Sequence, residues 1–379
     1  MLQLRKSSFF TYFLFIPLIL IYHLFEDIKQ VFYILPVPIV LSMLVFQYFN
    51  HQGEQMKLDK NMVQILVLYL AICGLSLFFA QDQIYWFTAW RDIIIISSPL
   101  IIFCFNVKYT HINVIVLMIA SFLGYLIWIR FKIDLVFLKS LLVSNFEWRN
   151  EYDYGTITGI FIIYFLYKKD YKFLILSILF LLFVNKRATF LGLIPAILTF
   201  YGIIKFFRID KSKGWLAVFL FAYFLFFYVF SINLPLIASV FLELMERKDI
   251  VLDDFLTGRI VMIRELTPEI YDRGWLNYLF GNGPGQADFY LWKVIKHPIY
   301  NFYTRPINPH NDFLKLHFDI GLVGVLIYFL IMYYMYCVSN VGVMIFLFVV
   351  PLFLIENTLI YYLNLILCCV VARTDEYSD

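Results

Sequence analysis

Long runs of apolar residues, separated by short polar stretches, recur along the whole chain. We expect helices near 9–25, 30–49, 62–80, 92–107, 112–129, 155–167, 173–184, 188–207, 215–234, 319–337, 341–355 and 358–372. Most of these runs approach the length that crosses about 30 Å of hydrocarbon, and a helix satisfies every backbone polar group within such a run. A transmembrane β-barrel would instead show polar and apolar residues in alternation. The sequence therefore predicts an all-α, polytopic membrane protein with about twelve transmembrane helices.

One polar interval is much longer than the others and extends from about 235 to 318. Within it, 251–271 and 284–295 have the composition of short helical or interfacial segments, and prolines break the approach to the next apolar run. Basic residues are somewhat more frequent in the short loops on the side of the N-terminus, so the positive-inside rule predicts that both chain ends are cytoplasmic. We therefore expect one integral membrane domain over 1–379, with a large external loop at 235–318.

The composition supports a membrane protein and excludes several other classes. Hydrophobic residues make up 62% of the chain and charged residues 15%, and a soluble domain of 379 residues cannot bury that much apolar surface. A net charge of +3 gives no reason to expect nucleic-acid binding. The five cysteines lie in apolar runs without zinc or disulfide spacing, and the carboxylates lack the spacing of metal ligands. We therefore predict a protein that uses no metal and no cofactor.

The glycine-rich segment Gly281–Gly285 looks at first like a phosphate-binding loop. A dinucleotide-binding loop joins a strand to a helix, however, and the surrounding sequence predicts no strand. Pro284 also fits that turn poorly. We interpret the segment as a turn that shapes the long loop.

The most informative motif ends the long interval, in the sequence Asn308-Pro309-His310-Asn311-Asp312-Phe313-Leu314. Gly321 and Gly324 follow in the next apolar run, where small residues let helices approach each other closely. We expect His310 at the start of a helix, where the positive end of the helix dipole disfavours the imidazolium and keeps a base available. The nearby carboxylate of Asp312 acts in the opposite sense and favours the protonated imidazolium. The alternative is a histidine that caps the helix and has no chemical role.

This pattern resembles that of the O-antigen ligase/polymerase superfamily of bacterial membrane glycosyltransferases, and the similar region extends over about 187–372. The resemblance implies transfer of an oligosaccharide from undecaprenyl diphosphate to a glycan acceptor, at the periplasmic face of the inner membrane. It also implies that a flippase and a chain-length regulator act in the same pathway. Such a transfer needs positive charge to balance the departing diphosphate and a base for the acceptor hydroxyl.

The resemblance assigns roles to particular residues. His310 would be the base, and Arg187, in an Arg-x-x-x-Leu setting with Leu191, would bind the diphosphate together with Arg259. The remaining candidates for substrate binding are Asn311, Lys186, Arg264, Arg305 and Tyr303. The plainer alternatives are a snorkelling anchor for Arg187, a surface charge for Arg259 and a helix N-cap for Asn311.

Two versions of the reaction share this motif. A polymerase extends a lipid-linked repeat unit, whereas a ligase transfers the finished chain to lipid A–core. We favour the polymerase because the sequence from Pro309 to Lys315 looks more like that of surface-polysaccharide polymerases. A transporter of lipid-linked sugars is less favoured, because it predicts internal repeats, broken helices and charges at mid-membrane depth. The polar residues concentrate instead in one loop.

Overall fold

The computed structural model describes residues 16, 59–104, 109–140, 152–184, 186, 188–207, 214–244, 259–295, 309–354 and 362–374. All regular structure in these residues is helical, apart from one isolated bridge between Tyr109 and Thr374. The helices are α5 (Lys60–Phe78), α6 (Trp86–Phe103), α7 (His111–Ser140), α8 (Tyr152–Lys168), α9 (Tyr171–Val184), α10 (Ala188–Ile197) with the π-helix η3 (Leu198–Ile204), α11 (Trp215–Ile232), α12 (Leu234–Leu244), α14 (Arg259–Asp272), α15 (Trp275–Phe280), α16 (Gln286–Val294), α17 (Asp312–Tyr336), α18 (Asn340–Leu352) and α19 (Tyr362–Ala372). The predicted all-α class is confirmed.

Among the described helices, α5, α11 and α17 are long and apolar enough to cross a membrane. The predicted count of about twelve spans stays a prediction, because the expected helices at 9–25 and 30–49 lie almost wholly outside the described residues. Three predicted boundaries were wrong. Helix α6 begins at Trp86 rather than at 92, α7 continues to Ser140, well beyond 129, and α17 begins at Asp312 rather than at 319.

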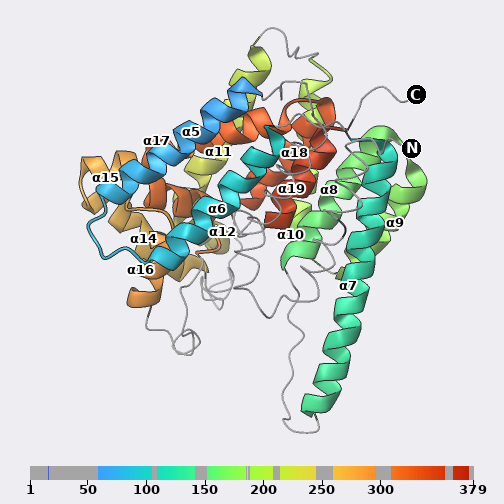
Figure 1. Cartoon of the computed structure of the whole chain (residues 1–379), viewed down its shortest axis with the longest axis horizontal. Helices are drawn as coiled ribbons and strands as arrows, with labels where there is room; N and C mark the ends of the chain where they lie inside the picture. The colour runs from blue at the N-terminus through green and yellow to red at the C-terminus, as the bar shows by residue number, and fades with distance from the viewer. Residues whose placement is uncertain are drawn as a thin grey trace, which may run out of the picture.

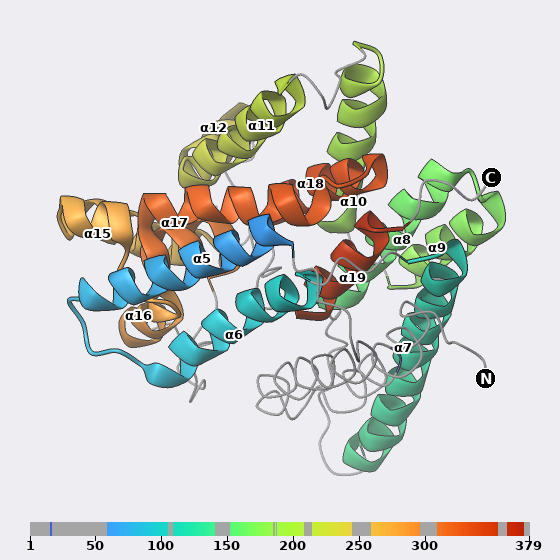
Figure 2. The same ribbon diagram turned by 45° about the horizontal axis from the view of Figure 1, so that its top comes forward.

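Helix α18 lies at the centre of the described bundle, with α5, α6 and α17 on one side and α7, α8 and α9 on the other (Figures 1 and 2). Its residues from Val341 to Leu352 are all buried, as expected for a helix that is apolar on every face. Close packing of α10 onto α18 depends on Gly192, where a Cβ atom would lie 2.6 Å from the carbonyl oxygen of Phe348.

Helix α17 is not one straight rod. Gly321 has φ 71° and ψ −178°, so it divides α17 into a first arm (312–320) and a second arm (322–336). The rings of Phe313 and Phe329 lie 5.2 and 5.4 Å from the ring of Phe224, so they are no farther apart than the sum of these distances. Sixteen residues of continuous helix would separate them by about 24 Å. The two arms therefore fold back on each other at Gly321.

Any side chain at position 321 is disfavoured by the positive φ and also by a close neighbour. A Cβ atom there would overlap the backbone of Leu279 and Phe280 in α15. This is the close approach that the sequence predicted at Gly321, but the break in the helix was not predicted.

Helices α14, α15 and α16 form a cap on the first arm of α17. Leu314 and Phe318 of that arm pack in one apolar cluster with Met262, Leu266 and Leu291 of the cap. Arg273 fastens the cap to the α5–α6 connection through an ion pair of 2.6 Å with Asp82. The predicted loop at 235–318 is therefore largely helical where it is described, and 312–318 belongs to α17.

Candidate active site

The predicted catalytic histidine directly precedes the first arm of α17. His310 is partly buried and has φ 52°, a left-handed conformation that residues other than glycine rarely adopt. Asn311 is the N-cap of the helix, and its side-chain oxygen accepts a hydrogen bond of 3.1 Å from the backbone N–H of Leu314. The N-cap role that the sequence offered as an alternative for Asn311 is thus present.

Neighbouring elements hold this helix start from two directions. The hydroxyl of Ser231, near the end of α11, donates to Asn311 Oδ1 at 2.7 Å. The backbone N–H of Asp312 donates to the carbonyl oxygen of Phe353, just after α18, at 2.8 Å. His310 and Asn311 therefore lie where the ends of α11 and α18 meet the start of α17.

A second histidine, His317, lies two turns farther along the arm and is buried. Its Nε2 lies 3.2 Å from the carbonyl oxygen of Tyr278, and its Nδ1 lies 2.6 Å from the hydroxyl of Tyr228. Because a carbonyl only accepts, Nε2 carries the proton and Nδ1 accepts from Tyr228. Both ring nitrogens are engaged within the protein, so His317 joins α11, α15 and α17 and has no nitrogen available for a substrate.

Lys186 lies at the same end of the helical core as His310. Tyr167 contacts both Phe200 of η3 and Asn340 at the start of α18, while Gly192 of α10 packs on Phe348. Helix α10 with η3 therefore runs antiparallel to α18.

This pairing places the start of α10 beside the end of α18. Lys186, directly before α10, is buried against Gly155 of α8. Phe353, after α18, accepts the hydrogen bond from Asp312. The chain neighbours of Arg187 thus share an end of the bundle with His310, whereas Arg187 itself lies outside the described residues.

Of the four other candidate residues, the structure describes the side chain of Arg264 alone. Arg259 begins α14, but its side chain lies outside the described residues, as do Tyr303 and Arg305. Arg264 is exposed on α14.

Five buried ionisable residues form a network on the face of the first arm opposite His317. Lys315 Nζ lies 2.7 Å from Asp92, 2.8 Å from Asp288 and 3.1 Å from Asp319. Arg91 pairs with Asp92 at 2.6 Å and also with Asp288. A buried charge is tolerated when it is paired and hydrogen-bonded, and here each carboxylate meets at least one cation. The network therefore joins α6, α16 and α17.

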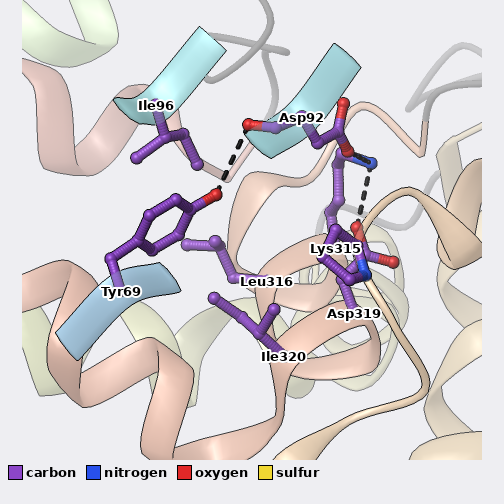
Figure 3. Close-up of a pocket in the computed structure, with 8 residues that line it drawn as sticks. Tyr69, Asp92, Ile96, Lys315, Leu316, Asp319 and Ile320 are labelled. Atoms are coloured by element: carbon purple, nitrogen blue, oxygen red, sulfur yellow. Dashed lines mark hydrogen bonds and ion pairs between the residues drawn. The ribbon is translucent and has the colours of Figure 1, made fainter. Parts of the chain in front are cut away.

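A small cavity borders this network (Figure 3). Tyr69 lines it from α5, Asp92 from α6, and Lys315 and Asp319 from α17. The Tyr69 hydroxyl donates to the backbone oxygen of Asp92 at 3.4 Å. Polar groups thus line one side of the cavity, and they are tied to one another across three helices.

The side chain of Asp319, from α17, also reaches the start of α16. Its carboxylate accepts hydrogen bonds from the backbone N–H groups of Gly285, at 3.0 Å, and Ala287, at 2.7 Å. These are the donors that a phosphate would use at a helix N-terminus. The protein's own carboxylate therefore fills the position, and the turn Gly281–Gly285 has the structural role that the sequence predicted.

The sequence interpretation overlooked every member of this network and His317. Asp288, Lys315 and His317 fall in the predicted external loop at 235–318, where charges are solvated. One signal was present in the sequence: Lys315 and Asp319 are four residues apart, between Leu314, Leu316, Phe318 and Ile320, which is the pattern of a buried helix with an internal ion pair.

In a comparison with known protein families, residues 173–329 match a family model described as O-antigen ligase, which covers less than half of the chain. No curated protein and no solved structure matches.

Proposed function

From the match of residues 173–329 to the O-antigen ligase family model, we propose that the protein belongs to this family and is a membrane glycosyltransferase of surface-polysaccharide assembly. Its reaction would be the polymerisation of oligosaccharide repeat units carried on undecaprenyl diphosphate, at the periplasmic face of the bacterial inner membrane. The cap would then face the periplasm. The alternative within the family is ligation of the finished chain to lipid A–core.

The observation that carries the proposal is the arrangement of His310 and Asn311. They start a wholly buried helical arm at the end of the bundle that also holds Lys186. His317 is the other imidazole of this arm, and its two ring nitrogens are bonded to Tyr228 and Tyr278. His310 is our candidate for the base because it directly precedes this arm in the motif from Pro309 to Leu314.

In the proposed reaction, His310 accepts the proton of the acceptor hydroxyl as the hydroxyl oxygen attacks the anomeric carbon of the donor sugar. The bond between that carbon and the diphosphate oxygen breaks, and undecaprenyl diphosphate leaves as an anion. Arg187 and Arg259 would hold this diphosphate, since a guanidinium group pairs with phosphate oxygens and stays charged. Direct attack inverts the anomeric configuration. No metal is required, because the two arginines would balance the charge of the leaving group.

The other predicted substrate-binding residues are part of the same proposal. Asn311 and Lys186 would contact the glycan or the diphosphate, with Arg264, Tyr303 and Arg305 as further contacts from the cap side. A flippase and a chain-length regulator would act with the protein in the same pathway. The preference for a polymerase rests on the sequence from Pro309 to Lys315.

A transporter of lipid-linked sugars is the second candidate, because the structure has two features that the sequence did not predict. Helix α17 is broken at Gly321, and charged residues are buried inside the protein. Both features occur in transporters. The charges argue for a fixed structural network, however, since Lys315 makes an ion pair with each of three carboxylates and the cap is bonded to them.

A deletion strain complemented with His310→Ala tests the proposal. Its surface polysaccharide should carry a single repeat unit on the core, while the amount of protein in the membrane stays unchanged. Long chains that accumulate on the lipid carrier would identify a ligase instead. Unchanged polysaccharide would refute both activities.

His111→Gln is the matched control, because His111 lies at the start of α7, where it contacts Tyr164 and Asp170. This variant should restore chain extension to the wild-type level.

A further inference from the structure

The side-chain amide of Asn311 has an unambiguous orientation. Its Oδ1 accepts one hydrogen bond from the Leu314 N–H and another from the Ser231 hydroxyl. A backbone N–H can only donate, so the amide atom that faces Leu314 must be the oxygen. The amide nitrogen therefore points away from the helix turn that the residue caps.

This amide nitrogen has no hydrogen-bond partner within the described part of the chain. Asn311 is 1% exposed, so the two N–H donors are withdrawn from bulk water as well. Buried donors without partners are rare in native proteins, and each one requires an explanation such as a bound water or ligand. The capping role of Asn311 does not supply one, because it uses only the oxygen.

A second observation places this donor at a site of chemistry. The adjacent residue, His310, is held in a left-handed conformation that is unfavourable for a residue with a side chain. Such strain persists only where the surrounding structure imposes it, and it concentrates at functional sites. The unpaired amide and the strained backbone belong to consecutive residues.

We propose that Asn311 Nδ2 donates a hydrogen bond to an oxygen of the bound acceptor sugar, and that Ser231 is the positioning residue that holds the amide in this orientation. The inference rests on the proposed function and adds to it a residue of α11. The acceptor sugar is the partner because His310, the base for its hydroxyl, is the neighbouring residue.

The bound oxygen belongs to an uncharged group. Asp312, the next residue, is fully buried, and its carboxylate disfavours a second anion at the same place. A sugar hydroxyl or the carbonyl of an acylated amino sugar accepts from an amide without this penalty. The donor diphosphate is thereby assigned to the arginines and not to Asn311.

Two substitutions separate substrate binding from helix capping. Asn311→Ser keeps an oxygen that caps the helix and removes both amide N–H groups. Ser231→Ala removes the hydroxyl that orients the amide, whereas Ser231→Thr keeps a hydroxyl at the same position. Ser239→Ala is the matched control, because Ser239 is exposed and its hydroxyl donates to the backbone oxygen of Leu236 in its own helix.

Initial rates of the full-length protein in detergent would be measured with lipid-linked repeat unit isolated from a deletion strain. The acceptor would be a soluble glycoside of the same repeat unit, varied at a fixed donor concentration. Asn311→Ser should raise the KM for the acceptor about tenfold, the effect of one lost hydrogen bond to a substrate group. Ser231→Ala should raise it by a smaller factor, and Ser231→Thr should restore it. The KM for the lipid-linked donor should stay unchanged in all four variants.

The outcomes distinguish this inference from the proposed function. Activity of His310→Ala equal to wild type would refute the proposed function. An inactive His310→Ala together with an unchanged acceptor KM in Asn311→Ser and Ser231→Ala would refute the present inference alone, as would an equal rise of the donor KM. If the wild type uses lipid A–core and not the glycoside, lipid A–core replaces it as the varied acceptor and the same criteria apply. Thermal unfolding of each variant shows whether a loss reflects folding.

Discussion

Replacing Lys315 by methionine tests whether the buried ion network holds the first arm of α17 in place. Three carboxylates and two cations meet there, so the network has one more negative than positive charge when all five groups are ionised. Lys315→Met removes the ammonium group that contacts all three carboxylates and leaves Arg91 as the remaining cation. Methionine keeps most of the side-chain volume, so the change is mainly one of charge.

The expected loss of stability is large. Removing one partner of a buried ion pair costs about 3–5 kcal/mol, because the remaining charge stays buried without compensation. Asp319→Asn removes a negative charge instead and should cost less, about 1–3 kcal/mol, for the weakened hydrogen bonds to Gly285 and Lys315. Asp319→Asn should also offset part of the loss in Lys315→Met, since the double variant has one buried carboxylate fewer.

Unfolding in detergent, followed by tryptophan fluorescence, gives the free energies of the two single variants and the double variant. Lys60→Met, at an exposed residue that starts α5, is the matched control and should leave stability unchanged. Two results would refute the reasoning: a Lys315→Met protein as stable as the wild type, or a double variant whose loss equals the sum of the two single losses.

Two further predictions concern the backbone and the cap. Gly321→Ala should prevent recovery of monodisperse protein, because Gly321 has φ 71° and an added Cβ would overlap the α15 backbone. Gly74→Ala in α5 is the control and should fold, because an added Cβ there meets no atom within 4 Å, and equal yields of the two variants by size-exclusion chromatography would contradict the prediction. Arg273→Ala should release the cap from the α5–α6 connection, since it removes the ion pairs with Asp82 and Glu269. Hydrogen exchange of 275–295 should then increase by about an order of magnitude, the effect of losing roughly 1–2 kcal/mol of local stability, and unchanged exchange would show that apolar packing alone holds the cap.

The apolar runs predicted the helices of the described bundle well, because a helix in lipid or in a protein core is apolar over most of its length. Helices α8, α9, α11 and α18 begin and end within a few residues of their predicted bounds. The prediction failed at the start of α17, where Asp312, Lys315, His317 and Asp319 interrupt the apolar pattern. All four are buried all the same, and Lys315, His317 and Asp319 have partners in α6, α11, α15 and α16.

Only those features of the candidate site that involve residues close in sequence could be predicted. An asparagine before an apolar helix is a common N-cap, and the sequence proposed that role for Asn311. The contact between Asn311 and Ser231 joins residues 80 positions apart, and the network joins Arg91 to Asp288 over 197 positions. No pattern in one sequence indicates which distant residue approaches which. The roles of Arg187 and Arg259 stay predictions for the same reason.

The spacing between Asn311 and Gly321 has a physical explanation in the first arm. The asparagine caps the helix and the glycine ends it, so the nine residues between them form the whole arm, about 13.5 Å long. One end of the arm, at Asn311, contacts Ser231 at the end of α11, and the other end, at Gly321, lies against Leu279 in α15. One additional residue would rotate the far end by about 100° and turn Asp319 away from α16, so the arm could not satisfy both ends. The position of His310 is therefore fixed by a helix whose length matches the distance between two other elements, and not by the residues next to it alone.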